Sequence, residues 1–257
     1  MITQLNEGIQ CLKMYYAYTI IIKVCIKSII EVINGKGKNM KKRISKKYFK
    51  NSDEVKTVLD TLEAAYPDAD CALHHDSIFH LLLAVVLSAQ TTDASVNKVT
   101  PKLFRTYEEP SQLAKANITD VEDMIKTLGL YKNKAKSLVG IGKMLCESYG
   151  GEVPHDFVEL QKLPGVGRKT ANVVMSVGFG EPHIAVDTHV FRVSNRIGLV
   201  TEEDVLKTEK ALMEIIPENR WSHMHHVLIF HGRQCCTARN PKCDECCIGD
   251  VCRYNQK

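Results

Sequence analysis

The sequence predicts an all-α protein, and two observations lead to this fold class. Apolar residues recur at helical spacing in one segment after another, and capping or stop signals separate the segments. Between residues 53 and 65, for example, Val55, Val58, Leu59 and Leu62 fall on one helical face. No segment shows the sustained apolar–polar alternation, bounded by hairpin turns, that is typical of strands.

The order of the predicted helices follows from the same signals. Residues 77–88 read SIFHLLLAVVLS, which is apolar nearly all round and predicts a central buried helix. Asp93 is expected to cap a helix that runs to Phe104, and Thr119 with Glu122 forms a capping-box pattern. Further helices are expected over 124–128, 133–149, 156–163, 202–216 and 221–232.

Charge is distributed unevenly along the 257 residues. Residues 1–49 contain ten Lys/Arg and two acidic residues, which gives them a net charge of +8. The other 208 residues contain 24 basic and 28 acidic residues, so they carry −4. A nucleic-acid-binding face on the folded part must therefore be a local basic patch rather than a global positive field.

Residues 1–49 form an N-terminal extension whose composition differs from that of the remaining chain. The apolar stretch 15–33 is interrupted by Lys23, Lys27 and Glu31, and each central charge costs about 2.5–3.5 kcal/mol in a membrane. This pattern argues against a spanning helix, and the lack of a small-residue cleavage site argues against a signal peptide. We expect the native protein to start at Met40; an amphipathic surface helix is the alternative.

The central motif of the sequence is residues 161–189, QKLPGVGRKTANVVMSVGFGEPHIAVDTH, which predicts a helix, a tight turn and a second helix. Pro164 stops one helix, Gly165 and Gly167 form a tight turn, and the next helix begins near Arg168. The first backbone N–H groups of a helix lack partners within it and lie at the positive end of its dipole. This turn therefore predicts a seat for an anion such as a nucleic-acid phosphate.

Two reactive side chains accompany this turn. Lys169 lies in the first turn of the second helix, and Asp187 follows 18 residues later, just before the helix that begins Thr188-His189. Alone, each has an ordinary interpretation, since a first-turn lysine is commonly solvated and an aspartate before a helix is commonly its N-cap. Their combination with the glycine turn indicates a catalytic site.

Six of the ten cysteines fall within the last 23 residues. Cys236, Cys243, Cys246 and Cys252 have the spacing C-x6-C-x2-C-x5-C, and four thiolates in one compact loop can bind a 4Fe–4S cluster. A four-cysteine zinc site, which usually consists of two separated CxxC knuckles, is the alternative. Cys235 and Cys247 lie outside the spacing. Arg239 and Lys242 lie between the first two ligands and are candidate phosphate contacts.

Several of these motifs together resemble the endonuclease III family of helix-hairpin-helix DNA glycosylases. The resemblance rests on LPGVGRKTA, AVDTHVFRVSNR, LSAQTTDASVNKVTPKLF, IKTLGLYKNKAKSL and the cysteine spacing, and it extends from Ser52 to Tyr254. It implies two helical domains that flank a DNA-binding cleft. Residues 71–180 would form a six-helix barrel containing the hairpin, while residues 50–70 and 181–257 would form the cluster domain.

The resemblance also implies an activity and residue roles. The family removes oxidised pyrimidines from duplex DNA and cleaves the strand 3′ to the abasic site. Lys169 and Asp187 would be catalytic and would face each other across the cleft. Gln90 would fill the gap left by the extruded nucleotide, and Leu130 would wedge into the opposite side. Gly165, Gly167 and Arg168 would bind the backbone. We further expect a monomer in the bacterial cytosol or nucleoid, without membrane association.

Three alternatives share parts of this pattern. Adenine-mismatch glycosylases have the hairpin, the aspartate and the cluster, but they lack the lysine and carry a long extra C-terminal domain. A thymine–guanine mismatch or pyrimidine-dimer glycosylase would use the same scaffold. A non-catalytic DNA-binding or redox iron–sulfur protein would not need both Lys169 and Asp187, which this chain has.

Overall fold

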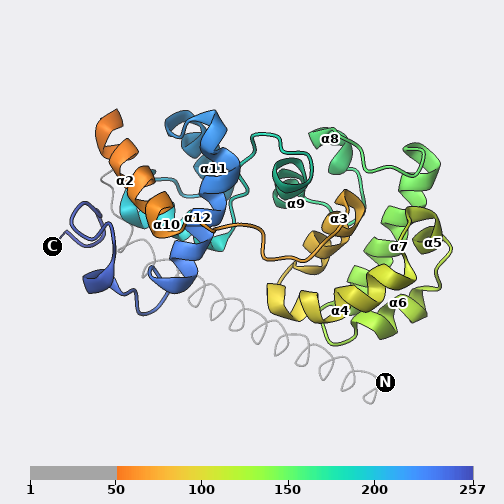
Figure 1. Cartoon of the computed structure of the whole chain (residues 1–257). Helices are drawn as coiled ribbons and strands as arrows, with labels where there is room; N and C mark the ends of the chain where they lie inside the picture. The colour runs from red at the N-terminus through yellow and green to blue at the C-terminus, as the bar shows by residue number, and fades with distance from the viewer. Residues whose placement is uncertain (1–50, 257) are drawn as a thin grey trace, which may run out of the picture. The chain divides into compact units, whose positions relative to one another are not determined.

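A computed structural model describes residues 51–256, and within this range every regular element is a helix (Figure 1). The all-α fold class is therefore confirmed. The N-terminal extension, with the expected start at Met40, lies outside the described residues. The helices are α2 (Ser52–Ala65), α3 (Ile78–Leu87), α4 (Asp93–Thr106), α5 (Pro110–Ala114), α6 (Ile118–Ile125), α7 (Tyr131–Ser148), α8 (Phe157–Leu160), α9 (Arg168–Val173), η1 (Val174–Gly178), α10 (Thr188–Ile197), α11 (Val205–Ile215), η2 (Glu218–Arg220), α12 (Trp221–Gln234) and η3 (Cys243–Glu245).

The first hydrophobic core surrounds α3. Every residue of this helix from Phe79 to Leu87 is buried, as its continuous apolar run predicts, and Ser77 caps its start by accepting from the N–H of His80. Helices α4, α7 and α9 and the π-turn η1 pack against it, and α5 and α6 pack against α7. The hairpin helix α9 and helix α7 thus pack against the same central helix.

The second hydrophobic core joins segments from opposite ends of the chain. Val58, Leu59 and Leu62 of α2 pack with α10 and α12, and the same cluster includes Cys236, Ile248 and Cys252. In Figure 1, α2 lies beside α12 accordingly. The C-terminal cysteine segment thus packs into this helical core through its own buried side chains.

Two of the expected caps are wrong. Thr92, not Asp93, caps α4: its side chain accepts from the N–H of Ser95, and Asp93 is the first helical residue. Asn117 rather than Thr119 caps α6, because its side chain accepts from the N–H of Thr119. Thr and Asn are both good capping residues, so each true cap lies one or two residues before the residue that the sequence pattern indicated.

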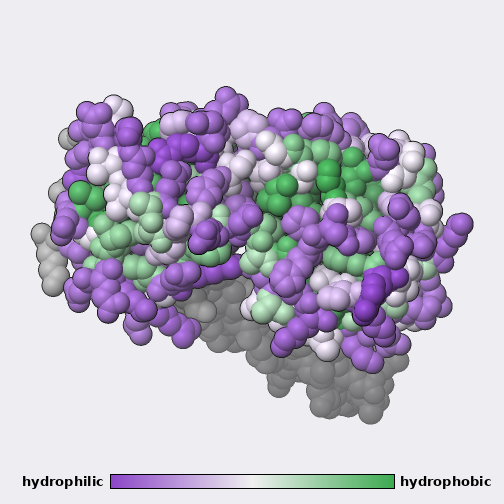
Figure 2. All heavy atoms as spheres, viewed as in Figure 1, coloured by the Kyte–Doolittle hydropathy of each residue, from purple (hydrophilic) through white to green (hydrophobic). Residues whose placement is uncertain are grey.

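The surface of the described part is mainly polar. In the view of Figure 2, hydrophilic residues cover much of both helical groups, and apolar residues are visible on the face of each group. Leu130 is unusual among the large apolar residues because 56% of it is exposed. None of the helices in residues 51–256 combines the length and apolar character needed to cross a bilayer.

Candidate active site and iron–sulfur centre

The turn between α8 and α9 uses its two glycines differently. Gly165 has a φ of +79°, and a Cβ there would lie 2.8 Å from the Ser137 hydroxyl, so the fold itself requires glycine. Gly167 has a φ of −93° and is the N-cap of α9, and a Cβ there would meet nothing within 4 Å. The structure gives no packing reason for glycine at residue 167, which leaves room for an incoming ligand.

Lys169 and Asp187 line the same pocket, which lies where the two cores meet. Lys169 is exposed on the first turn of α9, and Asp187 is half-buried at the start of α10. The structure therefore brings together an amine and a carboxylate that are 18 residues apart. A DNA sugar that entered this pocket would meet both groups.

Asp187 is also a helix cap, as its position suggested. Its Oδ1 accepts from the N–H of His189 at 2.7 Å and from the N–H of Val190 at 2.8 Å. Both cap bonds fall on Oδ1, and within residues 51–256 the other carboxylate oxygen has no hydrogen bond. Capping fixes the direction of the carboxylate through the backbone of α10.

Arg168 forms a strong contact within the protein. Its guanidinium binds the carboxylate of the buried Glu209 with contacts of 2.5–3.1 Å and lies 5.0 Å from the centre of the Phe157 ring. Glu209 also accepts from Asn172 on α9 at 3.0 Å. The Arg168 side chain thus ties the hairpin to α11 and is engaged within the protein.

Residues that the sequence interpretation did not assign to the site also line this pocket. Arg233 pairs with Asp93 at 2.7 Å across its wall. His225 and His226 are buried there, and neither His225 ring nitrogen nor His226 Nε2 has a hydrogen-bond partner in the described structure. Burial lowers the pKa of His226 to about 4 and that of His225 well below its ordinary value. Both rings are therefore neutral at pH 7.

Gln90 and Leu130 protrude from tight turns. Gln90 is exposed between α3 and α4, and Leu130 is the exposed N-cap residue of α7. Lys134, one turn further along α7, donates from Nζ to the Thr91 hydroxyl at 2.6 Å. The two turns are thus joined by a half-buried hydrogen bond next to both protruding side chains.

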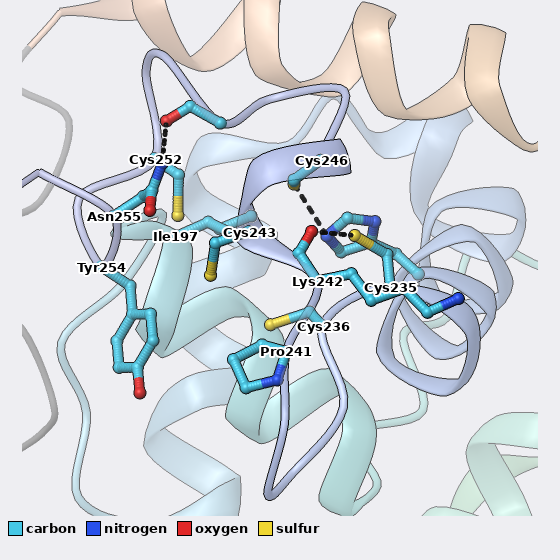
Figure 3. Close-up of a pocket in the computed structure, with 12 residues that line it drawn as sticks. Ile197, Cys235, Cys236, Pro241, Lys242, Cys243, Cys246, Cys252, Tyr254 and Asn255 are labelled. Atoms are coloured by element: carbon cyan, nitrogen blue, oxygen red, sulfur yellow. Dashed lines mark hydrogen bonds between the residues drawn. The ribbon is translucent and has the colours of Figure 1, made fainter.

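The C-terminal cysteines surround one cavity. Cys236, Cys243, Cys246 and Cys252 all line it, together with Cys235 and His231 (Figure 3). Figure 3 shows the sulfurs of Cys236, Cys243 and Cys252 directed toward a common space. A set of thiols facing one cavity has the donor chemistry that an iron–sulfur cluster requires.

The spacing of the sulfurs distinguishes a cluster from a zinc ion. With Zn–S bonds of about 2.3 Å, tetrahedral geometry would bring four sulfurs to about 3.8 Å from one another. Within residues 51–256, one group of three residues has ligand atoms that all lie within 4.8 Å of one another, and its members are His231, Cys235 and Cys246. No three of the four spaced cysteines in this range lie that close together. Cys236, Cys243, Cys246 and Cys252 would suit a 4Fe–4S cluster better than a single ion, because their sulfurs are spaced more widely than one ion requires.

Two arginines of α10 hold this loop. Arg196 donates to the carbonyl oxygens of Thr237 and Ala238 at 2.7 and 2.8 Å, and Arg192 donates to the carbonyl of Cys236. Arg239 and Lys242 are exposed on the loop that is held in this way. The sequence alone did not reveal the arginines' role, because their partners lie about 40 residues away.

The fold and these two sites define a class of protein. Residues 83–218 match the helix-hairpin-helix (HhH-GPD) superfamily of base excision DNA repair proteins, and residues 236–252 match the iron–sulfur binding domain of endonuclease III. The chain is 50% identical to endonuclease III of Bacillus subtilis over 208 residues, which are 80% of this chain and 95% of that protein. It is 44% identical to endonuclease III of Escherichia coli over 78% of this chain and 95% of that one.

The chain belongs to the endonuclease III family, whose members are DNA glycosylases and AP lyases that carry a 4Fe–4S cluster. It is an enzyme of base excision repair. A trapped covalent endonuclease III–DNA intermediate has a similar structure, with a TM-score of 0.78, 49% identity and coverage of 81% of this chain and 98% of that one. A thermostable thymine-DNA glycosylase matches with a TM-score of 0.72 and 26% identity, over 79% and 97% of the two chains.

Proposed function

We propose that Lys169 is the nucleophile and Asp187 the electrostatic partner of a reaction that removes oxidised pyrimidines from double-stranded DNA. The observation that carries this proposal is that both residues line one pocket. The Lys169 amine attacks the sugar C1′, the C1′–N bond breaks, and the base leaves with the bonding electrons. The Asp187 carboxylate stabilises the positive charge that develops at C1′ and assists proton transfer.

The amine explains the strand cleavage that follows. The sugar ring then opens: the C1′–O4′ bond breaks as Nζ forms a double bond to C1′, and O4′ takes up the proton that Nζ gives up. The resulting iminium acidifies the neighbouring C2′–H. Removal of that proton expels the 3′ phosphate by β-elimination, which cleaves the strand 3′ to the abasic site. Water then hydrolyses the iminium and restores Lys169. A hydroxyl or carboxylate nucleophile could not form this nitrogen-based intermediate.

The DNA contacts follow from exposure and backbone geometry. Gln90 enters the space left by the extruded nucleotide and Leu130 wedges into the stack from the other side, which offsets the few kcal/mol that base flipping costs. The N–H groups at Gly165, Gly167 and Arg168 bind a phosphate at the start of α9.

The four spaced cysteines Cys236, Cys243, Cys246 and Cys252 hold the cluster in this proposal. When bound, the cluster cross-links the C-terminal loop and supplies no group to the reaction at C1′. Arg239 and Lys242 then contact phosphates from a loop that the metal centre and Arg196 keep rigid.

We assign the barrel domain to residues 71–180 and the cluster domain to residues 50–70 and 181–257, with DNA bound in the cleft between them. The division of the core into two hydrophobic clusters supports these bounds. The enzyme acts as a monomer in the bacterial cytosol. Similarity to the thymine-DNA glycosylase favours a mismatched thymine as a second substrate class.

The experiment that tests the substrate compares duplexes carrying thymine glycol, dihydrouracil, uracil, a thymine–guanine mismatch or an abasic site. Base release and strand cleavage are scored separately for each duplex. We expect release and cleavage with thymine glycol and dihydrouracil, and cleavage alone with the abasic site. Release confined to the mismatch would assign the enzyme to the alternative class, and no release from any duplex would contradict a glycosylase.

A further inference from the structure

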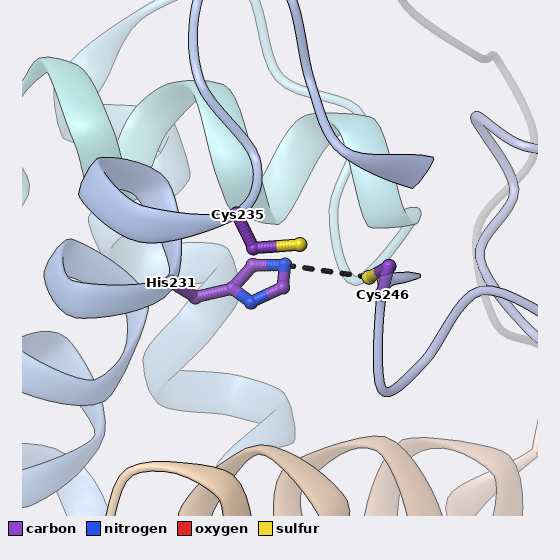
Figure 4. Close-up of side chains that lie close together, drawn as sticks. All are labelled: His231, Cys235 and Cys246. Carbon is purple, nitrogen blue, oxygen red and sulfur yellow. Dashed lines mark hydrogen bonds between the residues drawn. The ribbon is translucent and has the colours of Figure 1, made fainter. Parts of the chain in front are cut away.

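A fifth cysteine faces the cluster cavity. Cys235 lines the same space as the four spaced cysteines, and its sulfur, the sulfur of Cys246 and a nitrogen of His231 lie within 4.8 Å of one another (Figure 4). The Cys247 side chain also contacts that of Cys246, but Cys247 is exposed and does not line the cavity. The two extra cysteines therefore occupy different environments.

We propose that Cys235 is a reserve ligand of the iron–sulfur cluster, which takes the place of Cys246 when Cys246 leaves its iron. This proposal rests on the four-cysteine ligand set proposed above. Two sulfurs that bind one tetrahedral iron at about 2.3 Å lie about 3.8 Å apart, as for zinc. Cys235 and Cys246 are already within 4.8 Å, so a shift of about 1 Å brings the two sulfurs to the separation at which both can reach one iron.

The backbone around the two cysteines favours this direction of exchange. Cys235 is the C-cap of α12, and its N–H donates to the carbonyl of His231 at 3.0 Å. Cys246 follows the three-residue turn η3 and lies in a loop. The Cys235 sulfur is held at the cavity by its own bond to the Lys242 carbonyl, so it stays in reach when Cys246 leaves its iron.

The exchange conserves charge and protons. The Cys235 thiol, which donates to the Lys242 carbonyl at 3.5 Å, gives up its proton as its sulfur binds iron. The bond from iron to the Cys246 sulfur breaks, and Cys246 accepts a proton to become a thiol. The proton that Cys235 gives up thus balances the proton that Cys246 accepts. His231 Nε2 lies 3.8 Å from the Cys246 sulfur, and its Nδ1 is paired with the Tyr66 hydroxyl at 3.1 Å. No oxidant or reductant is needed.

The first test counts iron and records absorbance near 400 nm in purified variants, with circular dichroism as the check of folding. We expect Cys246→Ser to keep about four irons per chain, and Cys235→Ser/Cys246→Ser to lose them. Cys246→Ser/Cys247→Ser is the matched control and should keep them. Cys243→Ser, whose sulfur is outside the group of close donors, should lose the cluster even with Cys235 present.

Loss of iron in Cys246→Ser to the level of Cys243→Ser would overturn the proposal, as would retention in Cys235→Ser/Cys246→Ser. Full iron in Cys243→Ser would instead show that the ligand set itself is wrong, and the proposal would fall with it. Alkylation with iodoacetamide and peptide mass spectrometry add a direct readout. In Cys246→Ser, Cys235 should be protected and Cys247 modified.

A second test avoids substitution of any of the four ligands. Cys235→Ser and Cys247→Ser are compared with the unaltered chain for the rate at which an iron chelator removes the cluster. Cys235→Ser should lose iron roughly tenfold faster than the unaltered chain. This is the lower end of the effect on metal affinity when a residue that supports a metal ligand is removed. Cys247→Ser should lose iron at the rate of the unaltered chain. Equal rates in all three proteins would contradict a reserve role for Cys235.

Discussion

Gln90 and Leu130 share a backbone conformation that no other non-glycine residue adopts within residues 51–256. Their φ angles are +54° and +59°, in the left-handed region that disfavours residues with a Cβ. Such a conformation costs about 1–2 kcal/mol per residue and is kept where the surroundings or a function require it. The same two residues are those for which we propose entry into the DNA stack.

Relief of this strain should separate stability from activity. Leu130→Gly and Leu130→Ala both remove the side chain that would enter the DNA stack, but only glycine removes the penalty of the left-handed backbone. The free energy of unfolding of Leu130→Gly should therefore exceed that of Leu130→Ala by about 1 kcal/mol. Both variants should release bases from paired lesions slowly while cleaving a ready-made abasic site nearly normally, because no base remains to be extruded. Urea unfolding and single-turnover release measure the two effects, and equal losses on both substrates would exclude the wedge.

Lys134 should act on the reaction through the turn that carries Gln90. Its Nζ holds the Thr91 hydroxyl at 2.6 Å, and burial lowers its pKa. Lys134→Met keeps the length of the side chain but removes this bond, so Gln90 loses its fixed direction. We expect slower release from a paired lesion with unchanged cleavage of an abasic site. Thr91→Val should reproduce the effect; normal release in both variants would show that the bond only stabilises the fold.

The two hairpin glycines should respond in opposite ways. Gly165→Ala should destabilise the fold by about 1 kcal/mol or more, because of its positive φ and the close Ser137 side chain. Gly167→Leu should lower the melting temperature less than Gly165→Ala, since its Cβ enters open space and only the N-cap preference is lost, yet raise the dissociation constant for any duplex, damaged or not. Tight binding by Gly167→Leu would show that no phosphate approaches this turn.

Stability should fall in acid because of the histidines of the catalytic pocket. The pKa of His226 is about 4 in the folded chain and about 6.5 when unfolded, so the unfolded state takes up its proton first as the pH falls. The stabilisation is complete above pH 6.5 and is lost as the pH falls through about 4, up to roughly 3 kcal/mol. Melting curves should show a shallower decline for His226→Gln than for the exposed control His74→Gln. Parallel declines would rule out this linkage.

Local chemistry was enough to predict the elements on which the site is built. The apolar run before Ser88 predicted the buried helix α3, and the order of Pro164, Gly165 and Gly167 predicted where α9 begins. Asp187 was recognised both as a cap and as a candidate for chemistry. These features depend on neighbours in the sequence, which a sequence displays directly.

Features that depend on distant partners could not be predicted in this way. The Glu209 that binds Arg168 is 41 residues away, and the carbonyl groups held by Arg196 are equally remote. Leu130 gives no sign in the sequence that its backbone is left-handed, because glycine or asparagine would be the expected residue there. Only the packed structure reveals these constraints.

The central claim is that Lys169 forms the covalent bond to DNA, and borohydride trapping of a protein–DNA adduct tests it most directly. Lys169→Gln should give no trapped adduct while still binding a damaged duplex, whereas the exposed hairpin control Lys162→Gln should trap normally. Asp187→Asn should slow base release roughly a hundredfold or more, yet keep some trapping on a ready-made abasic site. A trapped adduct of Lys169→Gln at the yield of the unaltered chain would mean that another amine is the nucleophile.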